Sequence, residues 1–525
     1  MTASNDVSTL TGRDAETQEL RMNAVKGKNL LYLASNSTAG SSPTYMVEMM
    51  ADLRKRGLVI YGVFETPTEK KPTCPYLDQL KSNDAVDHVF FAELNCEEAA
   101  SNVVEAIKHL DVKFDGVWGG RELIQPVVGM VAELLGAPGR NPAHSYQMAR
   151  DKYKTRVALA NAGLNTPMAY PVKSVDDVPK CIETVGFPMI IKPTAGAGSE
   201  GVHKVYTEEE LTKAVGTILE DIEVNPLLST QGMTDFCPIV AETLLVPIIY
   251  NDLVQEFDVE VLMSKGESVY SNVVDNWIPD APYFQDKGFN FPSLAPKSVQ
   301  EELIEYSIAC VKALGFINGN FHVESMYTEY GPALLEVNPR VGGAEIQNFH
   351  ERVFGVNPNL NFLLALLDIP INPPRFDVPA MGRLHHFINA PTTGVLEDLT
   401  FLDHFEGHEY VTKIEYIAKV GASVRGIDTG VPQWLGGVVF EFPEEKMLSA
   451  IEELKVLMKQ AEDNVRKLIT PIRKFSLTRR KSIVLDVVED LEPAQKRRVR
   501  KSITIDDIDL EEILALEASI ATTTI

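Results

Sequence analysis

The sequence predicts a protein of the α/β class, and three observations predict it. Strand-like and helix-like apolar patterns alternate as far as about residue 140. A strand containing a lysine runs into a glycine-rich loop at 188–202, and two acid-bearing strands pair at 319–343. Alternation at this pace is typical of a parallel sheet covered by helices. The 525 residues exceed one ordinary core, so we expect roughly three to four structural units.

Composition and charge narrow the class of protein. With 45% hydrophobic and 23% charged residues, the chain has the composition of an ordinary globular protein. Its net charge of -25 argues against nucleic acid as a partner, because nucleic-acid binders present a basic surface. No run approaches the ~18 apolar residues of a membrane span, and residues 1–28 lack the apolar core of a signal peptide. We therefore expect no membrane contact and a cytoplasmic location.

The cysteines give no sign of a disulfide framework or a zinc site. They are scattered, odd in number and without a C-x-x-C spacing, a pattern that favours reduced thiols. The five are Cys74, Cys96, Cys181, Cys237 and Cys310.

The first part of the chain predicts a leader followed by a parallel α/β layer. Residues 1–28 are polar and rich in Thr, Ser and Asn, and we expect a disordered leader there. The apolar patterns that follow predict strands at 30–34, 58–64 and 114–118 and helices at 45–56, 100–110 and 123–135. No G-x-G-x-x-G follows the first strand, so the pattern does not predict a dinucleotide site.

The next segment places a lysine beside a glycine loop. A helix is predicted at 151–162, a second at 174–185 and a strand at 188–193, which contains Lys192. The loop after that strand has three glycines and a serine, whose backbone N–H groups can close over phosphates: Gly196, Gly198, Ser199 and Gly201. The G-K-[ST] ending of a Walker A loop is absent. A plain hairpin between two strands is the alternative interpretation.

Two further strands carry carboxylates. The strand at 238–245 is apolar apart from Glu242 and Thr243, and at a hinge its backbone could pair with a purine edge while Glu242 accepts from the exocyclic amine. The strand at 256–261 alternates polar and apolar residues, as a half-buried strand should. For its acids Glu256, Asp258 and Glu260, a solvated strand face remains an equal alternative.

The most informative stretch is a hairpin at 319–338. Alternation sends Glu336 and Asn338 to one face, and Glu324 can face the same way across a turn at 327–331. Hard oxygen ligands around a small volume suit Mg²⁺, and Arg340 adds a planar cation suited to an anionic intermediate. A solvated face is the alternative, but charges inserted between apolar strands are costly unless something compensates them.

Together these motifs resemble the ordered signature of the ATP-grasp superfamily. The resemblance rests on Lys152, the 190–193 strand, the glycine loop, the 241–245 strand, and the His322-Val323-Glu324 and 335–340 strands. It covers roughly residues 29–460, and five motifs in order are far more specific than one. Within the superfamily, 338–343 and the C-terminal region resemble carboxylate–amine ligases of the L-amino acid ligase (bacilysin synthetase) and carnosine synthase type.

The resemblance implies a fold and a domain order. We expect an ATP-grasp fold with an N-terminal Rossmann-like parallel α/β domain, two α+β ATP-grasp lobes and a C-terminal α+β extension. The expected boundaries are 1–28 for the leader, 29–147 for the N-terminal domain, 148–375 for the ATP-grasp domain with a flexible lid lobe at about 185–245, 376–468 for the C-terminal subdomain, and 469–525 for a charged, disordered tail.

The resemblance also implies roles for individual residues. Lys152, Lys192 and the loop with Gly196, Gly198, Ser199 and Gly201 match the groups that hold the phosphates of ATP. Glu242 with the backbone of Thr243 and Leu245 matches the adenine hinge, and Glu256 matches a ribose contact. Glu324, Glu336 and Asn338 match the ligands of two Mg²⁺ ions, for which Mn²⁺ can substitute. Arg340 matches the arginine that steadies the acyl-phosphate and the tetrahedral intermediate.

The implied activity is ATP-dependent ligation of amino acids. A substrate carboxylate attacks the γ-phosphate of ATP, and an amine then displaces phosphate from the acyl-phosphate to give a dipeptide-like amide, with release of ADP and phosphate. One alternative is a nucleotide-binding regulatory protein without turnover; another is a carboxylase or purine-pathway ligase. Ligases of this type are often homodimers.

One position departs from the resemblance. Many such ligases carry a Gly-His pair in the loop after the central sheet, whereas this chain has Gly288-Phe289. If that histidine stabilises the transition state in relatives, this protein must use another group, which leaves its amino acid pair open.

The C-terminal part predicts short strands at 382–388, 410–416 and 436–442 and a helix at 443–467. Four histidines there (His385, His386, His404 and His408) suggest a metal, but adjacent residues of a strand point to opposite faces, so we interpret them as structural or surface residues.

The tail beyond about residue 471 alternates basic and acidic blocks. Ser482 and Ser502 each follow a basic cluster and are predicted kinase sites. Residues 506–518 could instead form a helix that binds a regulatory partner.

Overall fold

The computed structural model describes residues 12–35, 44–68, 76–196, 198–224, 236–279, 284–427 and 432–471. Contacts divide the chain into two units, Met1–Thr470 and Pro471–Ile525. Every element described below lies in the first unit, except that the last strand ends at Pro471. The predictions for Cys74, Ser482, Ser502 and the 506–518 helix fall outside the described residues.

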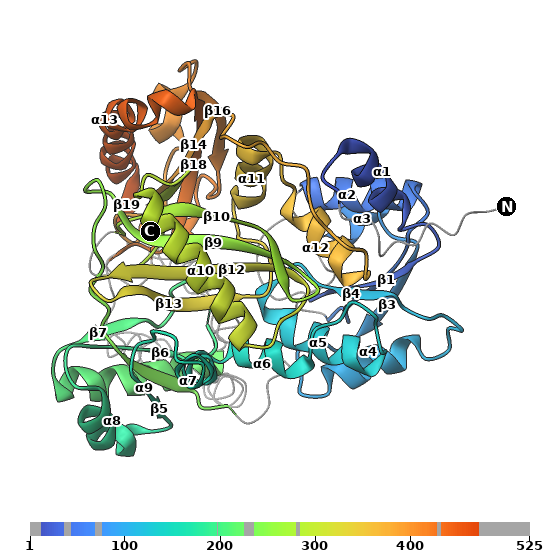
Figure 1. The fold of residues 1–525 in the computed structure, drawn as a ribbon. Helices are drawn as coiled ribbons and strands as arrows, with labels where there is room; N and C mark the ends of the chain where they lie inside the picture. The colour runs from blue at the N-terminus through green and yellow to red at the C-terminus, as the bar shows by residue number, and fades with distance from the viewer. Residues whose placement is uncertain are drawn as a thin grey trace, which may run out of the picture. The chain divides into compact units, whose positions relative to one another are not determined.

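The N-terminal part contains the predicted parallel sheet, with strand order β3-β2-β1-β4 (Figure 1). Leu30 and Tyr32 of β1 pack with α2 on one face, while Leu31 and Leu33 pack with α4 and α5 on the other. The sheet is therefore covered on both faces, as parallel sheets are. Its elements are β1 (Asn29–Ala34), α2 (Thr44–Lys55), β2 (Val59–Glu65), α3 (Leu77–Ser82), β3 (His88–Ala92), α4 (Ala99–Ile107), β4 (Gly116–Trp118), η2 (Glu122–Ile124) and α5 (Gln125–Leu134).

The predicted disordered leader is wrong for residues 15–23, which form α1 (Ala15–Asn23). Asp14 caps the helix by accepting a hydrogen bond from the N–H of Thr17. Arg21 is fully buried and donates to the carbonyl oxygen of Asn372, 2.8 Å away. This long-range contact fixes a segment whose composition alone suggests disorder.

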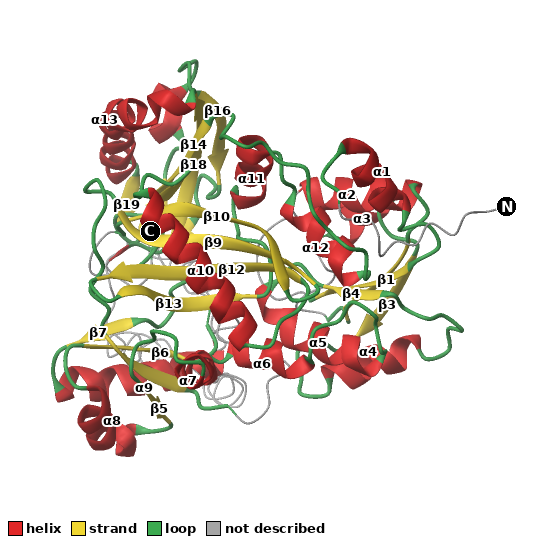
Figure 2. Cartoon of the chain, viewed as in Figure 1, coloured by secondary structure: helices red, strands yellow, loops and turns green. Residues whose placement is uncertain are grey.

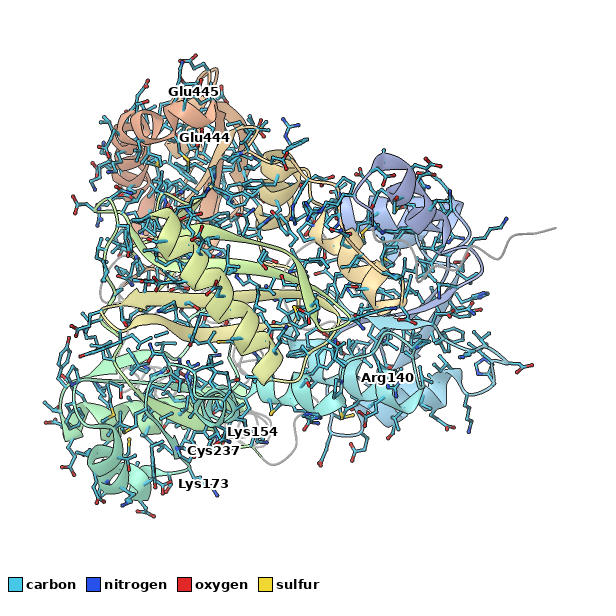
Figure 3. The ribbon with its side chains drawn as sticks, in the orientation of Figure 1. Arg140, Lys154, Lys173, Cys237, Glu444 and Glu445 are labelled. Carbon is cyan, nitrogen blue, oxygen red and sulfur yellow. The ribbon has the colours of Figure 1, made fainter. Side chains whose placement is uncertain are left out.

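A second lobe holds a four-stranded antiparallel sheet of order β5-β8-β6-β7. Its predicted helix starts are confirmed: Asp151 caps α7, and Ser174 forms a capping box with Asp177. Lys173 and Cys237 mark this lobe in Figure 3. The elements are α6 (Ala143–Arg150), α7 (Lys152–Asn161), β5 (Ala169–Val172), η3 (Val175–Asp177), α8 (Val178–Val185), β6 (Met189–Pro193), β7 (His203–Val205), α9 (Glu208–Val224) and β8 (Ile239–Thr243).

The largest sheet has eight strands in the order β13-β12-β9-β10-β11-β14-β18-β16. Helix α10 crosses one face of it, over β9, β10, β12 and β13 (Figure 2). Phe257, Val259 and Val261 of β9 pack under this helix, so the alternate residues of β9 face the opposite side. These elements are β9 (Val254–Ser264), β10 (Glu267–Trp277), β11 (Gly288–Phe291), α10 (Lys297–Ala313), β12 (Gly319–Thr328), β13 (Gly331–Asn338), α11 (Ile346–Phe354) and α12 (Pro358–Leu366).

The C-terminal strands continue the same sheet, so the predicted boundary near residue 375 lies within one sheet. The predicted strands and final helix are present, and α13 packs Ile451 and Leu454 onto β14 and β18. The elements are β14 (Gly382–Asn389), β15 (Gly394–Leu396), η5 (Thr400–Phe405), β16 (Val411–Tyr416), β17 (Ser423–Val424), β18 (Trp434–Phe442), η7 (Glu444–Lys446), α13 (Met447–Lys467) and β19 (Ile469–Pro471). Among the described helices, none combines the length and the apolar character needed to cross a bilayer.

Candidate active site

The predicted hairpin forms and brings its polar residues together. β12 and β13 pair so that Glu324 lies directly opposite Glu336 and His322 opposite Asn338. The amide Nδ2 of Asn338 donates to Glu324 Oε1 at 2.9 Å and to Glu336 Oε1 at 3.1 Å. The register shifts after Glu324, an irregularity of the kind that often re-aims side chains at functional sites. Two carboxylates and the side-chain amide of Asn338 therefore face one small volume.

Two cations flank these acids. Lys152, at the start of α7, places Nζ 2.7 Å from Glu336 Oε2. Arg340, just beyond β13, places Nε 3.0 Å from Glu122 Oε2. Glu122 begins the 3-10 helix after β4, and the sequence did not single out this carboxylate.

Glu324, Glu336 and Asp258 form an acidic cluster in which burial and mutual repulsion oppose ionisation of all the carboxylates. Burial and the neighbouring Glu336 raise the pKa of Glu324 well above its usual range. Burial would raise the pKa of Glu336 too, but Lys152 and Asn338 hold it far below its ordinary value. Burial raises the pKa of Asp258 to about 7, and its Oδ1 has no hydrogen-bond partner among the described residues. Buried carboxylates repel one another when all are ionised, and a divalent cation would offset this repulsion.

A magnesium site here would use Glu324, Glu336 and Asn338. The described residues contain no cluster of three Asp, Glu, His or Cys side chains in metal-binding geometry. This triad has only two carboxylates and an amide. That composition suits Mg²⁺, which binds a few protein oxygens and takes its remaining ligands from water and phosphate.

A buried network supports the hairpin from the side of β9. The carboxylate of Glu260 is fully buried and accepts from His322 Nδ1 at 2.7 Å and from the backbone N–H of Gly342 at 3.0 Å. The other nitrogen of His322 lies 3.5 Å from Glu324 Oε1. A Cβ at Gly342 would come within 2.7 Å of His322 Nδ1, so the close approach requires glycine there. Glu260 thus fixes His322, which lies beside Glu324, and the turn at Gly342 that follows Arg340.

The glycine loop is tied to the same region at several points. The carbonyl of Gly196 accepts from Arg150 Nη1 at 2.6 Å, and the carbonyl of Thr194 accepts from the N–H of Lys152 at 3.2 Å. Ser199 Oγ donates to the carbonyl of Phe284 at 2.9 Å. Gly198 and Gly201 have positive φ angles of 62° and 72°, which glycine adopts without strain. The loop therefore starts beside Lys152 and ends against the segment at 284–287.

Lys192 lies in a buried charge cluster with Glu242. Its Nζ is 2.7 Å from Glu242 Oε2, while Arg156 Nε is 2.9 Å from Glu242 Oε1. The carboxylate of Glu242 is 3% exposed and fully engaged, which favours a positioning role over the predicted adenine contact by its side chain. Lys152 and Glu242 both act on the pKa of Lys192, so the two lysines lie within electrostatic reach of each other.

The remaining predicted nucleotide contacts lie at two places. The N–H of Thr243 donates to the carbonyl oxygen of Met168 at 2.9 Å. Leu245 follows β8, and its N–H has no hydrogen-bond partner within the described residues. Burial and the neighbouring Asp258 raise the pKa of Glu256, so Glu256 lies within electrostatic reach of the acidic cluster.

Phe289, the residue that departs from the resemblance, lies among aromatic side chains in the structure. Phe289 is 5% exposed and packs against Phe349, Phe387 and His385. His385 and His386 are both buried, on opposite faces of β14, which agrees with a structural role.

Several site residues were not singled out from the sequence. They are buried or half-buried groups whose partners are distant in the chain: Glu122, Arg150, Arg156 and Asp286. The alternation at 256–261 was the one signal for Asp258 and Glu260. The structure buries both, at 5% and 0% exposure, so the solvated-face interpretation is wrong for them.

Comparisons with known proteins agree with this arrangement. Residues 185–348 match the family model described as "ATP-grasp domain". The chain is 25% identical over 272 residues to human carnosine synthase 1, covering 50% of this chain and 32% of that protein. It is 25% identical over 306 residues to alanine--anticapsin ligase of Bacillus subtilis (strain 168), covering 56% of this chain and 62% of that protein. The chain thus spans about a third of the carnosine synthase it matches.

The same fold occurs in a solved structure. The crystal structure of L-amino acid ligase from Bacillus licheniformis matches with a TM-score of 0.62 at 20% identity. The match covers 83% of this chain and 98% of that one, and it confirms the predicted fold class.

Proposed function

The chain carries an ATP-grasp domain, and we propose that it is an ATP-dependent carboxylate–amine ligase that joins two amino acids. The observation that carries the proposal is the convergence of Lys152, Glu324, Glu336 and Asn338 on one spot beside the glycine loop. The names of its relatives, alanine--anticapsin ligase, carnosine synthase and L-amino acid ligase, support amino acids as the substrate class.

The nucleotide lies between the lobes in this proposal. Lys152 and Lys192 bind its phosphates, and both exchange their present carboxylate partners for phosphate oxygens. The backbone of Thr243 and Leu245 receives the base. Glu324, Glu336 and Asn338 would hold Mg²⁺, one ion or two, and the bound metal would neutralise charge on the phosphates.

The reaction follows in two displacements. An oxygen of the substrate carboxylate forms a bond to the γ-phosphorus of ATP while the bond to the ADP oxygen breaks, which gives an acyl-phosphate and ADP. The nitrogen of the second amino acid then forms a bond to the acyl carbon. The bond between that carbon and the phosphate oxygen breaks, phosphate leaves with the oxygen and the electron pair, and the nitrogen loses a proton. Arg340 stabilises the negative charge on the tetrahedral intermediate, and Glu122 orients its guanidinium.

The glycine loop protects the intermediate from water. Its hydrogen bonds with Arg150, Phe284 and Lys152 hold it beside the start of α7 and the segment at 284–287. A loop that excludes water prevents hydrolysis of the acyl-phosphate before the amine arrives.

A coupled screen tests the proposal. Purified full-length protein is incubated with Mg-ATP and pairs of amino acids, phosphate release is measured, and products are weighed by mass spectrometry. We expect at least one pair to give phosphate together with a product whose mass is that of both amino acids less one water. The control variant is Glu329→Gln, because Glu329 is an exposed carboxylate on the turn of the same hairpin. It should keep full activity while Glu324→Gln loses it.

Binding of ATP without phosphate release for any pair would contradict the ligase proposal and favour the regulatory alternative. Phosphate release that requires bicarbonate in place of an amino acid would favour a carboxylase-type reaction.

A further inference from the structure

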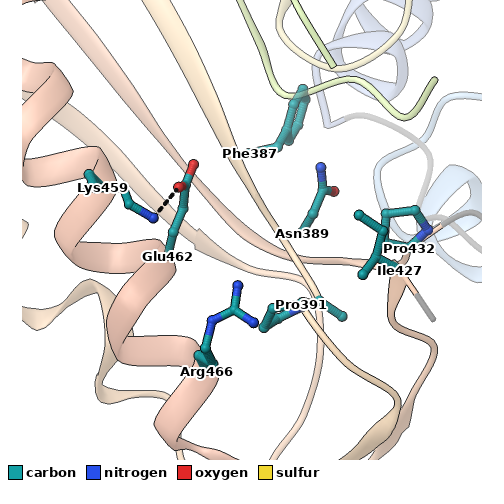
Figure 4. Close-up of a pocket in the computed structure, with 9 residues that line it drawn as sticks. Phe387, Asn389, Pro391, Ile427, Pro432, Lys459, Glu462 and Arg466 are labelled. Atoms are coloured by element: carbon teal, nitrogen blue, oxygen red, sulfur yellow. Dashed lines mark ion pairs between the residues drawn. The ribbon is translucent and has the colours of Figure 1, made fainter. Parts of the chain in front are cut away.

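Arg150 is a buried cation that takes no direct part in the proposed reaction. It is the last residue of α6 and is 5% exposed. A charged pair near the surface looks different: beside the cavity in Figure 4, Lys459 pairs with Glu462, and 63% of the Lys459 side chain remains exposed. Burial of a guanidinium is costly unless neighbouring groups compensate for the lost water, so the contacts of Arg150 indicate what it does.

Two acids of the active site compensate for part of this cost. Burial lowers the pKa of the Arg150 guanidinium, whereas Glu122 and Glu336 raise it. Glu122 pairs with Arg340 at 3.0 Å. Glu336 pairs with Lys152 at 2.7 Å. Arg150 therefore lies within electrostatic reach of the acid that orients Arg340 and of an acid that is expected to hold the metal.

The same guanidinium contacts the glycine loop. Its Nη1 donates to the carbonyl oxygen of Gly196 at 2.6 Å. Two residues after Arg150, the backbone N–H of Lys152 donates to the carbonyl oxygen of Thr194 at 3.2 Å. Both acceptors lie at the start of the loop, directly after β6. These two donors therefore hold the loop where it leaves the strand.

The alternative is that Arg150 only neutralises two buried acids. A point charge could do that without a directional contact to the loop, and lysine would serve as well as arginine. A planar guanidinium presents donors on several sides, so one rigid group can bond a carbonyl and face carboxylates at once. The bond to the Gly196 carbonyl is the observation that neutralisation alone does not require.

We propose that Arg150 is a positioning residue that fastens the glycine loop to the active-site acids and so couples the consumption of ATP to amide formation. This role rests on the proposed function. While the acyl-phosphate exists, the loop keeps water from its acyl carbon. Arg150 holds the first residues of the loop during that time, because its bond to Gly196 and its attraction to Glu122 and Glu336 act on one rigid group.

Loss of this contact leads to a defined side reaction. The oxygen of a water molecule forms a bond to the acyl carbon, and the bond between that carbon and the phosphate oxygen breaks. Phosphate leaves with the oxygen and the electron pair, and the water oxygen releases a proton to the solvent. The substrate acid is regenerated, so ATP is converted to ADP and phosphate without formation of an amide.

The ratio of phosphate to amide measures this uncoupling. With the amino acid pair that the coupled screen identifies, the unmodified protein should release about one phosphate for each amide. Arg150→Met should release at least about three, because the acyl-phosphate is then open to water. Arg150→Lys keeps the positive charge but not the planar fork, so it should fold as the unmodified protein does and still release at least about two.

Arg140→Met is the matched control. Arg140 is exposed, and its guanidinium also donates to a backbone carbonyl, that of Ala137 at 3.0 Å (Figure 3). The substitution removes the same charge and the same kind of bond, but this bond joins neighbouring residues of the chain and does not reach the glycine loop. The variant should keep about one phosphate for each amide.

Hydrogen exchange on the full chain without nucleotide tests the loop contact independently of turnover. Peptides that cover 194–201 should exchange at least about threefold faster in Arg150→Met and Arg150→Lys than in Arg140→Met, because local opening becomes easier when the loop loses a contact. Peptides from β12 and β13 should exchange at the same rate in all three variants, which shows that the fold is intact.

Two results would overturn the proposal. One is a ratio of about one phosphate for each amide in both Arg150 variants, even where both turn over slowly, because a loss of rate with intact coupling indicates a structural cation. The other is exchange at 194–201 that matches that of Arg140→Met in both. A screen that finds no reacting pair contradicts the ligase proposal instead, and the exchange rates then decide whether Arg150 holds the loop.

Discussion

Replacing Glu242 with glutamine removes one charge from a buried cluster of three. The carboxylate lies between Arg156 and Lys192, at 2.9 and 2.7 Å, and is 3% exposed. Burial alone would raise the pKa of Glu242, but the two cations overcome it and lower that pKa from 4.5 to about 2. Glutamine keeps the shape of the side chain and one acceptor oxygen but carries no charge.

The size of the effect follows from the pKa. A carboxyl group whose pKa falls from 4.5 to about 2 on folding contributes about 3 kcal/mol to the free energy of unfolding at neutral pH. Because the folded pKa lies below the unfolded one, this contribution is complete above about pH 4.5 and is lost as the pH falls toward 2. Glu242→Gln should therefore be about 3 kcal/mol less stable at neutral pH, and the difference should shrink in acid.

Urea unfolding of both proteins at about pH 7, 5 and 3 measures this difference. The control is Glu183→Gln, which breaks an exposed pair with Lys180 in the same lobe and should leave stability unchanged. A loss for Glu242→Gln that is equally large at every pH would point to packing rather than charge. A loss no larger than that of the control would refute the reasoning altogether.

Three further outcomes follow from the site. Arg340→Ala should bind ADP within about threefold of the unmodified protein but lose at least about 100-fold in phosphate release, because the guanidinium acts on the intermediate; full activity would remove Arg340 from the chemistry. Glu260→Gln should lower kcat about 10- to 100-fold with little change in KM, since Glu260 orients His322 and the Gly342 turn without touching substrate; a KM effect alone would contradict that role. Chelation of divalent ions should abolish phosphate release and Mn²⁺ should restore it, whereas activity that survives chelation would rule out the predicted metal triad.

The hairpin could be predicted because its information is local. Alternation along β13 fixes Glu336 and Asn338 on one face, and a short turn fixes Glu324 opposite Glu336. The capped helices at Asp151 and Ser174 were predictable for the same reason, since a cap and the N–H groups it satisfies are only a few residues apart.

The supporting residues could not be predicted because their partners are distant. Glu122 reaches Arg340, and Arg156 reaches Glu242, only once segments that are distant in the chain have packed together. The acids of β9 illustrate the limit, because alternation predicted a strand with one buried face. In the structure α10 covers the face with Phe257, and Glu260 on the other face is also buried, against His322 and Gly342. Helix α1 was missed because its anchor, buried Arg21, binds the distant Asn372 carbonyl.

The most direct test of the account is a crystal structure of the full chain grown with Mn²⁺ and a non-hydrolysable ATP analogue, with the metal located by anomalous scattering. We expect manganese about 2.1 Å from oxygens of Glu324, Glu336 and Asn338, with Lys152 and Lys192 on the phosphates. Manganese or nucleotide bound elsewhere, with these carboxylates still paired only to protein groups, would contradict it.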